Sequence, residues 1–155
     1  MLGNVCVFAQ DPAPNQAVGT TLPGNVVTYR VNNDFVAVKV GEKKELTYPV
    51  TITGLDADGL AALGTNIELN VPVTFREKIG EKYYRFYVTE IKEGSLGNSF
   101  YGYTEISKLN FVAAPTADTP DQDGAWYKLA NFTYKVGDKA FYGCSGMTEL
   151  TFTKL

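Results

Sequence analysis

The chain has 155 residues, 45% of them hydrophobic and 20% charged, which is an ordinary composition for a globular protein of one large or two small domains. Its 14 basic and 17 acidic residues are interspersed and give a net charge of −3, which argues against nucleic acid or anionic lipid as a partner. Without histidine there is no Ser-His-Asp arrangement and no histidine-based metal site, and no stretch approaches the roughly 20 apolar residues of a transmembrane segment.

The N-terminal stretch, residues 1–9, is apolar and ends in the small residue Ala9, which is typical of the cleavage site of a secretory signal. The stretch is short and lacks a basic start, so we interpret it as a signal-peptide remnant, with a first β-strand as the alternative. Cleavage there would leave Cys144 as the single cysteine, and we expect a buried, inert thiol at that position. Residues 10–25 contain three prolines and no hydrophobic period, which predicts a leader or linker.

Three strands are predicted in the region that follows. Residues 26–31 and 35–40 are rich in β-branched side chains and flank a polar turn, which predicts a hairpin. Residues 46–53 predict a third strand, in which Pro49 fits an edge or a bulge better than the middle of a sheet.

One short helix is predicted within residues 54–64. Leu60 and Leu63 are spaced for one helical face, and Gly64 can end the helix. Asp56 and Asp58 fall in this passage, but they lack the ligand spacing and the closing glutamate of a calcium-binding loop. We therefore predict no metal site.

A second hairpin is predicted after the helix. Residues 66–75 read as a strand that contains Pro72, residues 76–82 as a polar turn, and residues 83–91 as a long aromatic strand.

A twelve-residue frame occurs twice in the second half of the chain, as F-Y-G-Y-T-E-I-S-K-L-N-F from residue 100 and as F-Y-G-C-S-G-M-T-E-L-T-F from residue 141. Three-residue steps followed by alternation predict a tight turn that leads into a strand. Such a unit must stack on another copy to bury its apolar side, so residues 109–111 and 150–152 should pair in parallel. The predicted core positions are Phe100, Ile106, Leu109, Phe111, Ala140, Phe141, Cys144, Met147, Leu150 and Phe152.

The run V-G-D-K-A-F-Y-G-C-S-G-M-T-E-L-T-F, which ends at Phe152, resembles the BspA-like class of bacterial leucine-rich repeats, whose units place an Ala-Phe pair, a Cys, a Leu and a strand in this order. The first copy departs from this pattern. Four extra residues follow Ile91, Ser95 and Leu96 stand near the expected Ala-Phe place, and Tyr103 replaces the cysteine. The hairpin of residues 66–91 is similar to the one that commonly introduces such repeat arrays.

The expected fold is therefore mostly β with short helical turns, in which a β-hairpin cap leads into a short BspA-like leucine-rich repeat solenoid. Residues 26–90 would form the N-terminal β-rich cap region, which covers the side of the first repeat that has no neighbour. Residues 91–155 would form two repeat units, with an inserted loop at residues 112–129.

The resemblance implies a non-enzymatic adhesion module, secreted or displayed at the cell surface, that binds a host or bacterial surface protein or glycan. We predict no catalytic residue and no cofactor, because nothing in the sequence gathers two carboxylates in a cleft. The alternatives are a purely structural role, as the cap and first repeats of a longer solenoid, and an Ig-like carbohydrate-associated module in the N-terminal half.

Exposed aromatic residues are the candidate contacts for such a partner. Tyr101 and Tyr142 follow the core phenylalanines and should point the other way. Trp126 and Tyr127 end the inserted loop, and the alternative for Trp126 is that it folds back onto the repeat edge as a lid. The last predicted strand has an open edge, which we expect further repeats to cover. Edge-to-edge self-association of two copies is the alternative.

Overall fold

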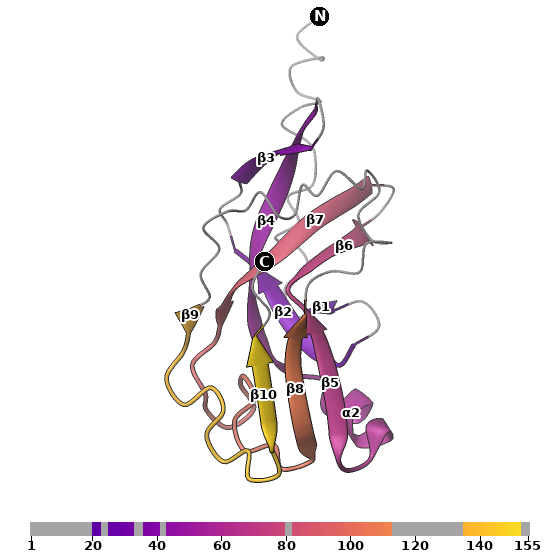
Figure 1. Ribbon diagram of the computed structural model, residues 1–155. Coiled ribbons are helices and arrows are strands. Elements are labelled where there is room, and N and C mark those ends of the chain that lie inside the picture. The colour runs from indigo at the N-terminus through magenta and orange to yellow at the C-terminus, as the bar shows by residue number, and fades with distance from the viewer. Residues whose placement is uncertain are drawn as a thin grey trace, which may run out of the picture.

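The structure, a computed structural model, describes residues 20–22, 25–32, 36–40, 43–79, 82–112 and 135–152. Within these ranges the fold is mostly β with one helix, and it has no closed barrel, as Figure 1 shows. The predictions for residues 1–9 and for most of the inserted loop lie outside the described residues.

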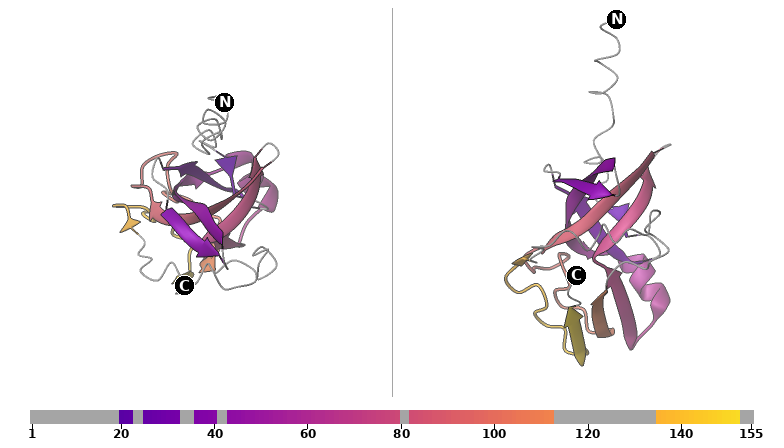
Figure 2. Two further views of the ribbon diagram at one scale, coloured as in Figure 1. Left: turned by 90° about the horizontal axis from the view of Figure 1, so that it is seen from above. Right: turned by 45° about the horizontal axis from the view of Figure 1, so that its top comes forward.

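Two sheets make up the described fold (Figures 1 and 2). A seven-stranded sheet has the order β1-β2-β4-β7-β6, with β3 also paired to β4 and β9 to β7, and a three-stranded sheet has the order β10-β8-β5. The elements are β1 (Thr20–Thr21), β2 (Val27–Val31), β3 (Val36–Val40), β4 (Lys43–Leu55), α2 (Ala57–Leu63), β5 (Ile67–Pro72), β6 (Thr74–Ile79), β7 (Lys82–Ile91), β8 (Ile106–Val112), β9 (Lys135–Val136) and β10 (Glu149–Phe152).

The prediction that residues 26–31 and 35–40 pair with each other as a hairpin is wrong. β2 and β3 both pair antiparallel with β4, which has 13 residues and is long enough to receive the two strands one after the other. Pro49 is buried within this central strand and is not at an edge. It falls between the segments paired with β2 and β3 and one residue before a β-bulge against β7, where a missing N–H removes little from the ladder.

The second predicted hairpin is only partly right, because β6 and β7 pair antiparallel but most of the strand expected to pair with β7 is β5, which lies in the other sheet. The strand expected over residues 66–75 divides at Val73, and residues 76–79 continue β6 instead of forming a turn. Val73 joins the two sheets, because its N–H donates to the carbonyl oxygen of Val112 (2.9 Å) and its own carbonyl accepts from Val88 (2.8 Å). Pro72, which has no N–H, ends β5 just before this crossing.

The predicted helix is α2. The side chain of Asp56 accepts a hydrogen bond from the N–H of Gly59 (3.2 Å), and Gly64, at φ 84°, ends the helix as expected. Leu60 is buried, but Leu63 is exposed, so the expectation of a shared apolar face is wrong. In a helix of seven residues only one position reaches the core, and Leu63 lies in the last turn, beyond that contact.

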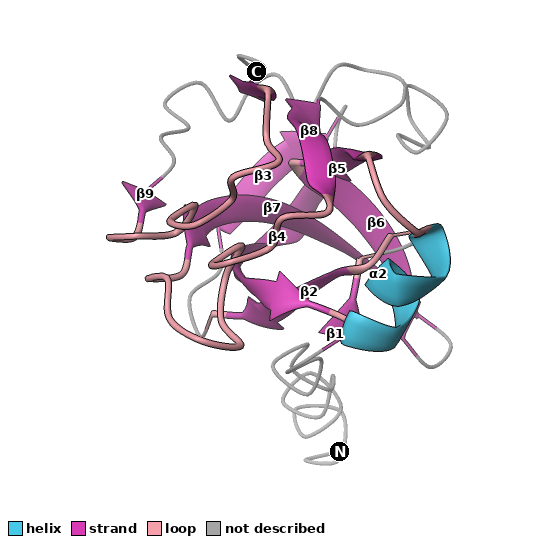
Figure 3. Ribbon diagram, turned by 90° about the horizontal axis from the view of Figure 1, so that it is seen from below, coloured by secondary structure: helices cyan, strands magenta, loops and turns pink. Residues whose placement is uncertain are grey.

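The lower half of the molecule consists of three segments that we call the first layer (residues 51–72), the second layer (residues 90–112) and the third layer (residues 135–152). Each begins in the seven-stranded sheet, passes through a helix or turns, and ends in the three-stranded sheet. β4, β7 and β9 pair in parallel along one side, and β5, β8 and β10 pair in parallel along the other. In the view from below, α2 lies on the β5 side of the layers and the turns of the other two layers lie opposite (Figure 3).

The parallel pairing of β8 with β10, predicted from the repeated frame, is confirmed. The frame was recognised in the second and third layers only. The first layer has no such frame, but its strand β5 aligns with β8 so that Leu69 lies beside Leu109 and Asn70 beside Asn110.

The four extra residues of the second layer form a separate loop, residues 95–98. Gly94 still hydrogen-bonds Asp138 of the third layer (2.8 Å), and the N–H of Phe100 donates to Ala140 (3.1 Å), so the register is regained on both sides of the loop. Ser99, which is fully buried, therefore takes the place of Ala140, and the expectation that Ser95 and Leu96 stand there is wrong. Leu96 is instead 92% exposed at the loop's surface.

Candidate binding surface

The predicted core positions differ in burial according to their layer. The second-layer positions and Ala140 are buried, as predicted, whereas the remaining third-layer positions are not fully buried. Buried are Phe100, Ile106, Leu109, Phe111 and Ala140; partly buried are Phe141, Cys144 and Met147; exposed are Leu150 and Phe152. The prediction that the third layer is buried throughout is wrong, because no described segment covers its outer side.

Aromatic rings hold the third layer against the second. The ring centroids of Phe100 and Phe141 are 5.4 Å apart, and those of Phe111 and Phe152 are 4.7 Å apart with nearly parallel planes. Offset ring pairs of this kind add to the free energy of area burial. Each third-layer phenylalanine therefore stacks on a phenylalanine of the second layer.

The thiol of Cys144 lies between the same two layers. It donates a hydrogen bond to the carbonyl oxygen of Phe100 (2.8 Å), and burial raises the pKa of Cys144 from its ordinary value. A thiol with a raised pKa is a poor nucleophile, which agrees with a structural role for this half-buried cysteine.

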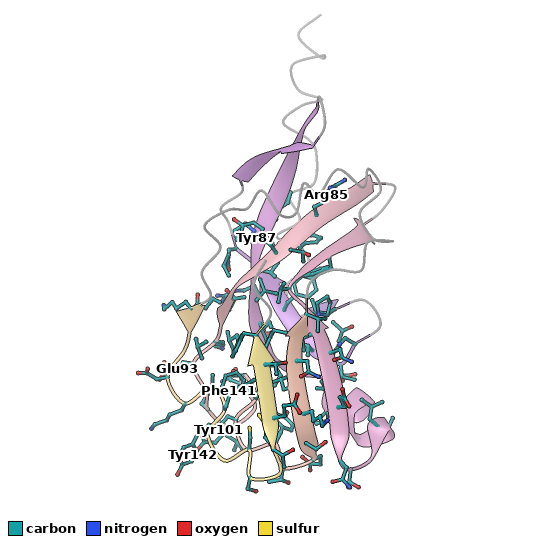
Figure 4. The ribbon with its side chains drawn as sticks, viewed as in Figure 1. Arg85, Tyr87, Glu93, Tyr101, Phe141 and Tyr142 are labelled. Atoms are coloured by element: carbon teal, nitrogen blue, oxygen red, sulfur yellow. The ribbon has the colours of Figure 1, made fainter. Side chains whose placement is uncertain are left out.

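Two of the four predicted binding residues, Tyr101 and Tyr142, come together. Their rings stack with centroids 5.4 Å apart and an interplanar angle of 23°. Tyr142 is 63% exposed, whereas Tyr101 is half-buried because Tyr142 covers one face of its ring. In Figure 4 both side chains lie on the turn side of the layers. We call Tyr101 and Tyr142 the tyrosine pair.

The backbone beneath the tyrosine pair fixes its geometry. The N–H of Gly102 donates to the carbonyl oxygen of Tyr142 (2.8 Å), which joins the two layers directly at the pair. Gly102 and Gly143 both have positive φ, a conformation that few other residues adopt without strain. Because each tyrosine follows a phenylalanine that points inward, its ring is directed outward by the turn itself.

The other two predicted binding residues, Trp126 and Tyr127, lie outside the described residues. Their contact with a ligand, and the alternative in which Trp126 folds back as a lid, stay predictions.

Sequence reasoning missed a polar network on the outer face of the three-stranded sheet. Asn110 donates to the side-chain oxygen of Asn70 (3.0 Å) and accepts from the hydroxyl of Thr151 (2.6 Å), so one amide links all three layers. Lys108 and Glu149 form an ion pair beside it (3.5 Å). The signal was present in the sequence, because each of these residues directly precedes or follows the aligned leucine of its layer.

The acidic side chains of the described residues lie on several separate elements. The Cys, Asp and Glu side chains of the described residues form no group of three or more that could hold a metal ion. Glu93 and Glu105 are exposed on separate turns, and Glu90 pairs with Lys135 (3.3 Å). Arg85 and Tyr87 are buried on β7, in the upper part of the molecule (Figure 4).

No helix within the described ranges is long and apolar enough to cross a membrane. Comparisons with protein-family models, with curated proteins and with solved structures give no match to this chain.

Proposed function

We propose that the chain is a non-enzymatic binding module, secreted or displayed at the cell surface, whose three layers are coils of a short BspA-like leucine-rich repeat solenoid. Its partner would be a surface protein or a glycan that contacts the tyrosine pair. The single observation that carries the proposal is the stack of Tyr101 and Tyr142, in which a large aromatic ring is kept 63% exposed by the turn geometry. The signal-like residues 1–9 and the resemblance to BspA-like repeats support the location outside the cell.

An exposed tyrosine held in this way is suited to recognition. The ring of Tyr142 is restrained by the ring beneath it, so little side-chain entropy would be lost when a partner covers its outer face. Tyrosine offers an apolar face and a hydroxyl together, which is why it is enriched among the residues that dominate binding energies. The same features would let it stack on a sugar ring.

The experiment is a screen of the full chain against glycan and matrix-protein arrays, followed by titration of any partner found. Tyr142→Ala should lower the affinity by about tenfold or more, the usual effect of removing a dominant contact residue. Leu96→Ala, at a residue that is 92% exposed on a second-layer loop, is the matched control and should leave the affinity unchanged. Equal affinity of the Tyr142→Ala and parent chains would contradict the proposal.

A purely structural role is the second candidate, and the open outer side of the third layer favours it. In that role the chain supplies the cap and first coils of a longer solenoid, and recognition is done elsewhere. The test is a chain extended after Phe152 by a copy of residues 112–152, which would continue the frame by one coil. A structural role predicts that this chain unfolds at a higher temperature than the parent, whereas an unchanged or lower unfolding temperature would argue against it.

The Ig-like alternative receives no support from the pairing of the strands. β4 and β7 are neighbours in the middle of the seven-stranded sheet and run parallel, whereas Ig-like sandwiches are built from antiparallel sheets.

A further inference from the structure

The two ends of the layered stack differ in what covers them. At the first layer, β2 pairs with β4, and the N–H of Asp56 donates to the carbonyl oxygen of Val26 (2.7 Å). The side chain of Asn25 donates to the carbonyl oxygen of Asn70 (2.8 Å), on β5. This end of the stack is therefore covered by the chain's own N-terminal strands.

The third layer presents apolar side chains on its outer side. Of the six large hydrophobic side chains exposed among the described residues, four belong to this layer. They are Val136 (44%), Tyr142 (63%), Leu150 (38%) and Phe152 (41%). Exposed apolar groups that gather in one layer are typical of a surface that is covered by a partner.

The backbone of β10 adds unused hydrogen-bonding groups to this surface. Within the described ranges β10 pairs with β8 only. The N–H of Thr148 donates to the carbonyl oxygen of Ser107 (2.8 Å), and N–H directions alternate along a strand. The N–H and C=O groups of Glu149 and Thr151 therefore point away from β8, toward the open edge.

We propose that a second copy of this chain covers the third layer, with the two β10 strands paired antiparallel about a two-fold axis at Thr151. The pairing would join the two three-stranded sheets into one continuous sheet. It goes beyond the proposed function, because it assigns a second copy as partner to the open edge of β10, whereas the tyrosine pair lies on the turn side of the layers.

A second copy suits this surface because the surface is self-complementary. With Thr151 opposite Thr151 of the second copy, their outward N–H and C=O groups form two hydrogen bonds, as in a hydrogen-bonded antiparallel pair. The same register puts Leu150 opposite Phe152 of the second copy, so the apolar side of the sheet continues across the axis. A shift by one residue would instead place Leu150 opposite Thr151, or Glu149 opposite Phe152.

In a head-to-tail arrangement the third layer of one copy would contact the first layer of the next. This arrangement is disfavoured because the first layer is already covered by β2 and Asn25. The surface that matches the third layer is thus the third layer of another copy. Phe152 stacks on Phe111 and still has 41% of its surface exposed.

The test is disulfide trapping of the full chain. Two variants are compared in a Cys6→Ser background, Thr151→Cys and Glu149→Cys, both on exposed positions of the same strand. About the proposed axis the Cα atoms of the two cysteines introduced at position 151 would lie about 5.5 Å apart, within disulfide range, whereas those of the two cysteines introduced at position 149 would lie about 15 Å apart. The Cys6→Ser chain alone, which keeps the half-buried Cys144, gives the background rate.

Under mild oxidation Thr151→Cys should form covalent dimers at least about tenfold faster than Glu149→Cys. Equal rates for the two variants would mean random collision or a parallel pairing and would overturn the proposal, as would rates no higher than the background. Circular dichroism of each variant checks that both are folded.

Sedimentation of the unmodified chain gives an independent readout. The interface is small, so dimers should appear toward about 0.1–1 mM, the weak end of specific association. Thr151→Pro removes an outward N–H and should abolish the dimer, whereas Leu96→Lys should not affect it. A parent chain that stays monomeric over the whole range, or a Thr151→Pro chain that still dimerises, would overturn the proposal.

Discussion

The first and third layers place the same kinds of side chain at the same register, yet bury them to different extents. In the ladder of leucines, Leu69 is 5% exposed, Leu109 is fully buried and Leu150 is 38% exposed. The difference lies in the neighbours, because the first layer is covered by the N-terminal strands and the third has described residues on one side only. A repeated frame thus determines where a side chain points, but the position of its layer in the stack determines how much that side chain stabilises the fold.

The largest expected effect is the difference in the free energy of unfolding between variants of Phe111 and Phe152, which are paired in β8 and β10. Phe111→Ala should lower the free energy of unfolding by about 3–5 kcal/mol, because the ring is fully buried between layers. Phe152→Ala should cost only about 1–2 kcal/mol, since 41% of its surface is already exposed. Urea denaturation of both variants measures the difference. Equal losses would mean that the third layer is as well covered as the second.

The close packing of the third layer on the second can be disrupted by a substitution at Gly146. A Cβ at this position would collide with the carbonyl oxygen of Thr104 in the second layer. Gly146→Ala should therefore lower the free energy of unfolding by about 1–3 kcal/mol, the usual cost of overpacking. Ser145→Ala, at the exposed neighbour, should stay within about 0.5 kcal/mol. If Gly146→Ala left the free energy of unfolding unchanged in the same urea series, the layers would be further apart than described.

The covered end can be tested at α2. Asp56→Ala removes the side chain that accepts from Gly59 and should lower the free energy of unfolding by about 1 kcal/mol. Asp58→Ala, in the first turn but without that hydrogen bond, should cost only a few tenths of a kcal/mol. Unfolding of the two variants at the same urea concentration would contradict a stabilising role for the hydrogen bond between Asp56 and Gly59.

The smallest expected effect concerns Cys144. Because burial raises the pKa of its thiol, the folded chain holds this proton more tightly than the unfolded chain does, so the thiol's contribution to stability is present at low pH and decreases as the pH rises above the ordinary value of 9.0. The stability of the parent chain should therefore fall more between pH 8 and 10 than that of Cys144→Ala, by less than about 1 kcal/mol. Parallel pH curves for the two chains would contradict this assignment.

The sequence predicted the second and third layers well because the frame is local. The three-residue steps before Met147 and the alternation after it describe a turn and a strand without reference to other parts of the chain. The parallel pairing then follows, since two copies of one frame can stack only in one direction. For the same reason the outward direction of Tyr142 could be predicted from the inward direction of Phe141.

The sequence could not predict what depends on distant partners. Nothing local distinguishes β2 pairing with β3 from both strands pairing with a longer β4, so the first hairpin was wrong. The first layer was missed because α2 takes the place of the turns, and only the register of Leu69 with Leu109 reveals the equivalence. The exposure of Leu150 was missed because the frame carries no information about the outer side of the last layer.

The central claim is that three layers pair in register and that, within the described residues, the outer edge of the third is bare. Amide hydrogen exchange on the dilute, monomeric chain tests this most directly, by comparing Thr151 with Asn110 of the neighbouring strand. Asn110 lies in β8, which is paired on both sides, and its N–H should exchange about a thousandfold or more slowly than an unprotected one. The N–H of Thr151 should exchange nearly as fast as in an unfolded peptide. Equal protection of Thr151 and Asn110 at low concentration would contradict the account, because it would mean that the edge of β10 is already paired within one chain.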